Sequence, residues 1–164
     1  MLVHASGINR GDIPVRLYRV EEGGAHYAFT QFEPSDARRM FPCFDDPSFK
    51  VPYALSITVP TGNLAFSNTS ELGRSPLDGG KKVRFRFGES EPMPSYLVAL
   101  AAGPLEVRDG VRTPVPIRLI AAAGRADRGD AALAAAAEHL AILTAFFAHP
   151  YPYGKLDLVA VPNF

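Results

Sequence analysis

The stretch TQFEPSDARRMFPCFDDPSFK, residues 30–50, decides the fold, and its first residues continue a predicted strand. That strand, HYAFTQF at 26–32, is rich in aromatic residues and threonine, which favour extended backbone. Successive side chains of a strand point to opposite faces. If the extension continues through Glu33, as the proline after it favours, Gln31 and Glu33 share one face. Phe32 then points the other way, into a core.

The polar pair formed by Gln31 and Glu33 has two interpretations. In a binding site, the Glu33 carboxylate holds a cation such as the α-ammonium group of a peptide through a charge-assisted hydrogen bond. Gln31 then lines a side-chain pocket beside it. The same residues also fit a solvated strand end with a local salt bridge, and their spacing alone favours this second interpretation.

The residues after the strand predict a short helix. Ser35 is expected to cap one or two helical turns through Asp36 to Met40, because a serine hydroxyl can accept a hydrogen bond from a free amide of the first turn. Asp36 in that turn suits the positive end of the helix dipole. Pro42 then stops the helix.

The stretch also contains one cysteine and two adjacent aspartates, and we expect structural roles for all three. Cys43 stands among apolar neighbours and has no second cysteine to pair with, which is typical of a small buried hydrophobe rather than a nucleophile. Adjacent carboxylates can act as acid and base. However, Asp45 and Asp46 precede a proline, which is typical of a turn, and we expect them to pair with Arg38 or Arg39.

The composition narrows the class of protein. Lys plus Arg and Asp plus Glu number 17 each, so the net charge of the 164 residues is zero. Nucleic acids and anionic membranes attract basic surfaces, so neither is expected as the main partner. A single cysteine fits a reducing compartment. The sequence shows neither a signal peptide nor an apolar run approaching the roughly 20 residues of a membrane-spanning helix, which predicts a cytoplasmic protein without a membrane span.

Residues 1–121 carry the pattern of an antiparallel β-domain. The run at 81–87 shows it best, because apolar and basic residues alternate along it. This strand is expected to be half-buried, with its apolar face toward a core, whereas its basic face could bind an anion or, more commonly, face solvent. Residues 71–80 are polar, contain a proline and paired glycines, and are predicted to form a loop. The other predicted strands span residues 2–5, 15–20, 51–60, 64–68, 95–102, 104–107 and 116–121.

The composition changes near residue 122. Asp130 can cap a helix, and apolar residues then recur every three or four positions, which predicts one amphipathic helix ending at Pro150. Its apolar face consists of Leu133, Ala137, Leu140, Leu143 or Thr144, and Phe147. A turn follows, and then a strand at 155–161.

The sequence contains no recognisable metal-binding motif. The pattern HExxH, which places two zinc ligands and a general base on one helical face, is absent. The four histidines, His4, His26, His139 and His149, show no ligand spacing. We therefore predict no metal ligand and no catalytic residue in this chain.

Three runs of the sequence resemble, in the same order, the zinc aminopeptidases of the alanyl aminopeptidase (aminopeptidase N) family, to which leukotriene hydrolase also belongs. They are residues 30–50, MPSYLVALAAG at 93–103 and the run at 150–162. The resemblance implies a mainly β fold, in which residues 1–121 form part of an antiparallel, saddle-like amino-terminal domain. Residues 122–164 would be the truncated beginning of a thermolysin-like α/β catalytic domain, which makes the chain α+β overall.

The same resemblance implies that the whole enzyme removes amino-terminal residues from peptides. Gln31 and Glu33 match the family residues that line the first specificity pocket and bind the free amino terminus, so they are the predicted substrate-binding residues. Zinc would be held by residues outside this chain, which is predicted to be inactive alone. Asp46 departs from the family, where glutamate is more usual. The alternative is a non-catalytic β-rich binding or scaffold module; the sequence specifies no oligomeric state.

Overall fold

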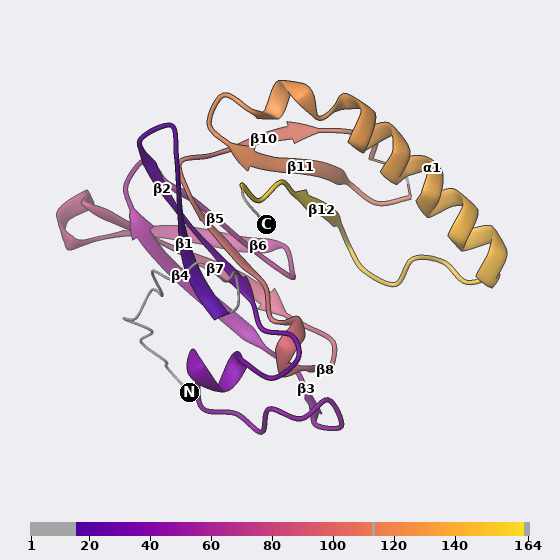
Figure 1. The fold of residues 1–164 in the computed structure, drawn as a ribbon, viewed down its shortest axis with the longest axis horizontal. Coiled ribbons are helices and arrows are strands. Elements are labelled where there is room, and N and C mark those ends of the chain that lie inside the picture. The colour runs from indigo at the N-terminus through magenta and orange to yellow at the C-terminus, as the bar shows by residue number, and fades with distance from the viewer. Residues whose placement is uncertain (1–15, 113, 163–164) are drawn as a thin grey trace. The chain divides into compact units, whose positions relative to one another are not determined.

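The computed structural model describes residues 16–112 and 114–162, which divide into two compact units (Figure 1). The first unit comprises the described residues up to Pro104, and the second comprises residues 105–162. The strand predicted at 2–5 lies outside the described residues. The boundary predicted after residue 121 separates the two domains that the family resemblance implies. It stays a prediction.

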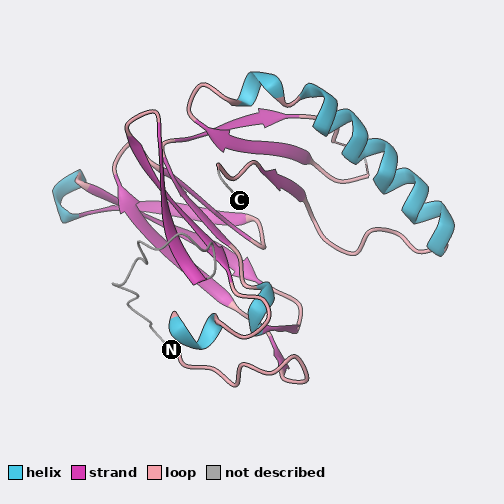
Figure 2. Cartoon of the chain, in the orientation of Figure 1, coloured by secondary structure: helices cyan, strands magenta, loops and turns pink. Residues whose placement is uncertain are grey.

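The first unit consists of short antiparallel strands, as predicted (Figure 2). One sheet has the order β1-β2-β9-β5, a second has the order β4-β7-β6, and β3 pairs with β8. The strands are β1 (Arg16–Glu22), β2 (Ala25–Gln31), β3 (Lys50–Val51), β4 (Ala54–Pro60), β5 (Leu64–Ser67), β6 (Glu71–Leu77), β7 (Lys82–Glu89), β8 (Met93–Pro94) and β9 (Leu100–Gly103). Three 3₁₀ turns interrupt them, namely η1 (Ala37–Arg39), η2 (Asp78–Gly80) and η3 (Ser95–Leu97).

The alternation read from the sequence places the core of the β4-β7-β6 sheet correctly. Phe85 and Phe87 are buried, and their strand pairs with β4, whose Ile57 and Val59 are buried on the same face. The basic residues between them are exposed. A half-buried antiparallel strand at 81–87 is therefore confirmed.

Two predictions in the first unit are wrong. Residues 71–77 form strand β6 rather than a loop, because they hydrogen-bond to β7 at the edge of the sheet, where polar side chains and Pro76 are tolerated. Residues 95–97 form a 3₁₀ turn rather than the start of a buried strand, and β9 begins only at Leu100. Val98, directly after this turn, is extended and buried.

The second unit is a small mixed sheet covered by one helix. Strand β10 (Leu105–Asp109) runs antiparallel to β11 (Ile117–Ala122), which runs parallel to β12 (Leu156–Val159). Parallel strands need a long crossover, and η4 (Ala126–Arg128) with α1 (Asp130–Phe147) supplies it. Strand β10 overlaps the strand predicted at 104–107, and it belongs to a different sheet from β9.

Helix α1 buries only part of its predicted apolar face. Leu133 and Leu140 pack on β11, but Leu143 and Phe147 are 51% and 66% exposed. Gly129 occupies the cap position predicted for Asp130, whose carboxylate instead accepts hydrogen bonds from Arg108. By length and mean hydropathy, 1.4 over 18 residues, the helix could cross a membrane, although core helices of water-soluble proteins meet the same criterion. One such helix therefore assigns no membrane span.

Gly103, the last residue of β9, is expected to be indispensable for the first unit. It has φ +147°, and an added Cβ would lie 2.7 Å from the Tyr27 ring and 3.0 Å from the His26 carbonyl oxygen. Gly103→Ala should therefore lower the free energy of unfolding by about 2–3 kcal/mol, measured by urea denaturation.

Gly62 provides the control, since it also has positive φ, +94°, but no atom lies within 4 Å of the position of an added Cβ. Gly62→Ala should cost only about 1 kcal/mol. Equal losses for the two variants would show that the contact with Tyr27 and His26 has no energetic effect.

Candidate functional site

The predicted substrate-binding pair lies where β2 ends. Strand β2 stops at Gln31, and the chain turns at Glu33 with a hydrogen bond from the Asp36 amide to the Phe32 carbonyl, 2.8 Å. Extension through Glu33 is therefore not observed. The two residues nevertheless remain adjacent, because the Gln31 Oε1 accepts a hydrogen bond from the Glu33 amide at 3.3 Å. Phe32 between them is fully buried, as predicted, and packs against Ala37.

Glu33 differs from the other acidic residues of its stretch. Asp36 binds Arg39, Asp45 binds Arg38, and Asp46 accepts two hydrogen bonds from Ser48. Glu33 is exposed, and among the described residues its carboxylate has no ion pair or hydrogen bond. The second interpretation of the pair, a solvated strand end, included a local salt bridge. Glu33 forms no such salt bridge within the described residues.

A buried carboxylate fixes the loop that follows the pair. The Asp45 side chain is 1% exposed and accepts hydrogen bonds from the Arg38 amide at 3.1 Å, the Arg38 Nε at 3.2 Å and the Ser95 hydroxyl at 2.5 Å. Arg38 also donates to the Asp45 carbonyl oxygen. The predicted pairing of this aspartate with Arg38 is confirmed. Ser35, in contrast, caps nothing, because the helical turn η1 begins after Asp36.

The electrostatics of this loop agree with a structural role. Burial alone would raise the pKa of Asp45, but hydrogen bonds from Ser95 and Arg38 outweigh it and hold the pKa below its usual range. Burial, and the negative charge of Asp45, raise the pKa of the Cys43 thiol. Cys43 is half-buried and stays protonated at neutral pH, which opposes a nucleophilic role.

A mostly apolar pocket of about 540 Å³ lies beside this loop. Its lining includes Cys43, Tyr53 and Val98, with exposed Phe44 and Phe49 stacked on each other, ring centroids 5.2 Å apart. Neither Gln31 nor Glu33 contributes to it. The predicted pair therefore does not line this cavity; Glu33 is exposed and Gln31 is half-buried.

The histidines that the structure describes, His26, His139 and His149, show no arrangement that could bind a metal. His26 faces Glu21 at 3.9 Å, His139 is exposed, and the ring of His149 lies 2.7 Å from the Pro150 carbonyl oxygen. Across residues 16–112 and 114–162, no three His, Cys, Asp or Glu side chains converge as a metal site. His4 lies outside the described residues.

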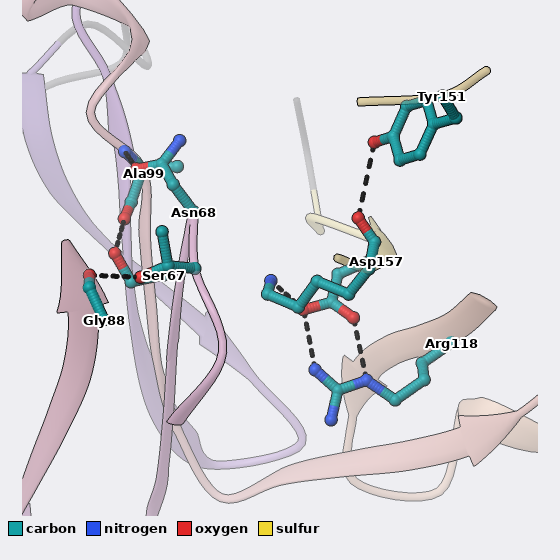
Figure 3. A network of polar contacts seen from close by, with 9 residues as sticks. Ser67, Asn68, Gly88, Ala99, Arg118, Tyr151 and Asp157 are labelled. Carbon is teal, nitrogen blue, oxygen red and sulfur yellow. Dashed lines mark hydrogen bonds and ion pairs between the residues drawn. The ribbon is translucent and has the colours of Figure 1, made fainter. Parts of the chain in front are cut away.

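The sequence analysis missed a charged cluster in the second unit. Arg118 donates two hydrogen bonds of 2.8 Å to the two carboxylate oxygens of Asp157, and the Lys155 ammonium donates a third (Figure 3). Burial alone would raise the pKa of Asp157, but these bonds outweigh it and lower the pKa. The sequence did contain a sign of this cluster, because β11 and β12 are mostly apolar and each contains a charged residue. The pairing of the two strands places Arg118 opposite Asp157.

Hydrogen bonds from side chains also fix the end of β5 in the first unit. The Ser67 hydroxyl donates to the Ala99 carbonyl oxygen at 2.9 Å, and the Asn68 Oδ1 accepts from the Ala99 amide at 2.8 Å (Figure 3). Next to them, Thr69 donates to the Gly88 carbonyl oxygen at 2.6 Å. These bonds join β5, β7 and the residues before β9, and they are structural contacts.

Comparison with known proteins identifies the family of this chain. Residues 11–97 match the family model of the Peptidase M1 N-terminal domain. The chain belongs to the M1 peptidase family. This confirms the resemblance to the aminopeptidase N group and the mainly β fold of the amino-terminal domain.

Several M1 aminopeptidases share a third or more of their aligned residues with this chain. Aminopeptidase M1 of Arabidopsis thaliana is 38% identical over 138 residues, which are 84% of this chain and 16% of the plant protein. Aminopeptidase 2 of Candida albicans is 38% identical over 145 residues, 88% of this chain and 16% of the yeast protein. Aminopeptidase N of Acetobacter pasteurianus is 36% identical over 134 residues, 82% of this chain and 38% of that protein. The M1 chain thus spans a small part of these relatives.

Asp45→Asn is expected to destabilise the first unit. An amide cannot accept all three hydrogen bonds from Arg38 and Ser95, so the free energy of unfolding should fall by roughly 2–3 kcal/mol at pH 7. Because the folded-state pKa of Asp45 is lowered, its contribution is present above the unfolded-state pKa, about 4, and is lost as the pH falls through the folded-state value. The difference between wild type and variant should therefore shrink below about pH 4, measured by urea denaturation.

Asp46→Asn provides the matched control, since this neighbouring carboxylate is exposed and bonds only locally to Ser48. We expect a clearly smaller loss of stability from it. A stability difference for Asp45→Asn that does not depend on pH would contradict the assigned role of its charge.

Proposed function

We propose that this chain is part of an aminopeptidase and that Gln31 and Glu33 help to recognise the amino terminus of its peptide substrates. The family membership and the names of the relatives support the aminopeptidase class. The observation that carries the residue assignment is the exposed Glu33 carboxylate, the one acidic side chain of residues 30–50 without a partner among the described residues.

The proposed recognition is electrostatic. A free peptide amino terminus is an ammonium group, which can donate hydrogen bonds to a carboxylate and is attracted by its charge. Buried Phe32 anchors the backbone between the two residues, so the Glu33 carboxylate projects from a fixed turn. The Gln31 amide, held near the Glu33 backbone, is positioned to contact the first residue of the same peptide.

The zinc chemistry of the proposed enzyme is assigned to sequence outside this chain. The described residues do not fit a metal, because no suitable cluster of ligands is found among them. We therefore derive no catalytic step from these residues and propose that the 164-residue chain is inactive alone. A cytoplasmic location stays a prediction.

Glu33→Gln should impair recognition of free amino termini, because it removes the charge and keeps the shape of the side chain. We test this with the 164-residue chain, titrated with Ala-Ala-Phe and with acetyl-Ala-Ala-Phe while the backbone amide resonances of residues 31–36 are followed by NMR. The free peptide should bind more tightly than the acetylated one, and Glu33→Gln should weaken its binding about tenfold or more. In a protein that joins this chain to a catalytic domain, the same change should raise KM for peptides with a free amino terminus.

Glu91→Gln is the control, because it removes an exposed carboxylate elsewhere in the first unit. Equal affinity for free and acetylated peptides, together with an unchanged KM in the larger protein, would eliminate the role of Glu33. If the chain binds neither peptide and its gene encodes no catalytic domain, the alternative of a non-catalytic β-rich binding or scaffold module would be favoured.

A further inference from the structure

The outer face of the β4-β7-β6 sheet carries a line of exposed cations. Lys82, Arg84 and Arg86 all lie on β7, at every second position, and all three are exposed. Residues two apart on a strand are separated by about 6.6–6.8 Å. We call these three residues the basic stripe.

Hydroxyl side chains flank the basic stripe on both neighbouring strands. In the sheet register Arg84 lies between Thr58 of β4 and Ser75 of β6. Arg86 lies between Ser56 and Gly73, and the guanidinium of Arg86 passes beside the glycine. Paired residues of an antiparallel sheet point to the same face, so these hydroxyl groups can donate hydrogen bonds alongside the guanidinium groups.

Arg84 and Arg86 differ from six other arginines of this chain, which bind a carboxylate. Such ion pairs are formed by Arg38, Arg39, Arg74, Arg108, Arg112 and Arg118. Among the described residues, Arg84 and Arg86 have no ion pair and no side-chain hydrogen bond. Lys82 is joined to Asp78 at 2.7 Å. Two adjacent, uncompensated guanidinium groups therefore occupy one face of a chain whose net charge is zero.

We propose that the basic stripe binds an extended acidic peptide segment. Carboxylates at every second residue of an extended peptide have the same spacing as Arg84 and Arg86, and guanidinium groups bind carboxylates through two parallel hydrogen bonds. Single-stranded nucleic acid is disfavoured, because such sites combine cations with aromatic platforms for the bases. No aromatic residue occupies the positions paired with the stripe, which are Ser56, Thr58, Pro60, Gly73, Ser75 and Leu77. The proposal does not depend on the aminopeptidase function.

The test uses the 164-residue chain and a fluorescein-labelled peptide of alternating aspartate and serine, with binding measured by fluorescence anisotropy at low salt. Arg84→Ser with Arg86→Ser should weaken binding about fivefold or more, and high salt should abolish it. The two side chains are exposed, so the melting curve of the double variant should match that of the wild type. A peptide with asparagine in place of aspartate should not bind.

The control variant combines Arg19→Ser with Arg112→Ser, which changes the net charge equally through exposed arginines outside the basic stripe. It should bind the acidic peptide as the wild type does. Equal weakening in both variants would overturn the proposal, because binding would then follow net charge alone. Tighter binding of oligothymidylate than of the acidic peptide, lost when Arg84 and Arg86 are replaced, would equally overturn it in favour of nucleic acid.

Discussion

The first unit depends on the burial of one carboxylate. Asp45 is almost inaccessible to water, and a buried charge without partners would cost several kcal/mol. It is satisfied only when Arg38 and Ser95 reach it together, although Ser95 lies 50 residues further along the chain. Folding of the loop after β2 is therefore coupled to the docking of η3.

In the second unit, a buried carboxylate and its cationic partners help to specify the register of the strands. Arg118 and Asp157 are paired across parallel strands, and Lys155 completes the set. A shift of β12 by one residue would move Asp157 to the other face of the strand and leave Arg118 without its partner. The same shift would remove Leu156 and Leu158 from the apolar cluster formed by β11 and the helix, so apolar packing and this charged pairing specify the same register.

Local patterns predicted the fold where the cause was local. Alternation at 81–87 identified β7 because burial of Phe85 and Phe87 leaves a signal within seven residues. Strand β6 left no such signal, since an edge strand is defined by its partner and tolerates polar residues and Pro76. The same limit applies to the site. The sequence placed Gln31 beside Glu33 and Asp45 beside Arg38, but Ser95 and the Arg118–Asp157 pair depend on distant pairing.

The charge balance around Glu33 gives the candidate site its character. Two arginines close to it in sequence could neutralise its carboxylate, but Arg38 is bound by Asp45 and Arg39 by Asp36. An exposed carboxylate loses little by remaining unpaired, so the fold tolerates this arrangement at small energetic cost. Its consequence is a local negative charge on an ordered turn, which attracts an incoming cation. The contact between exposed Arg38 and buried Asp45 thus orders the loop, and it also engages one of the two arginines that lie close to Glu33 in sequence.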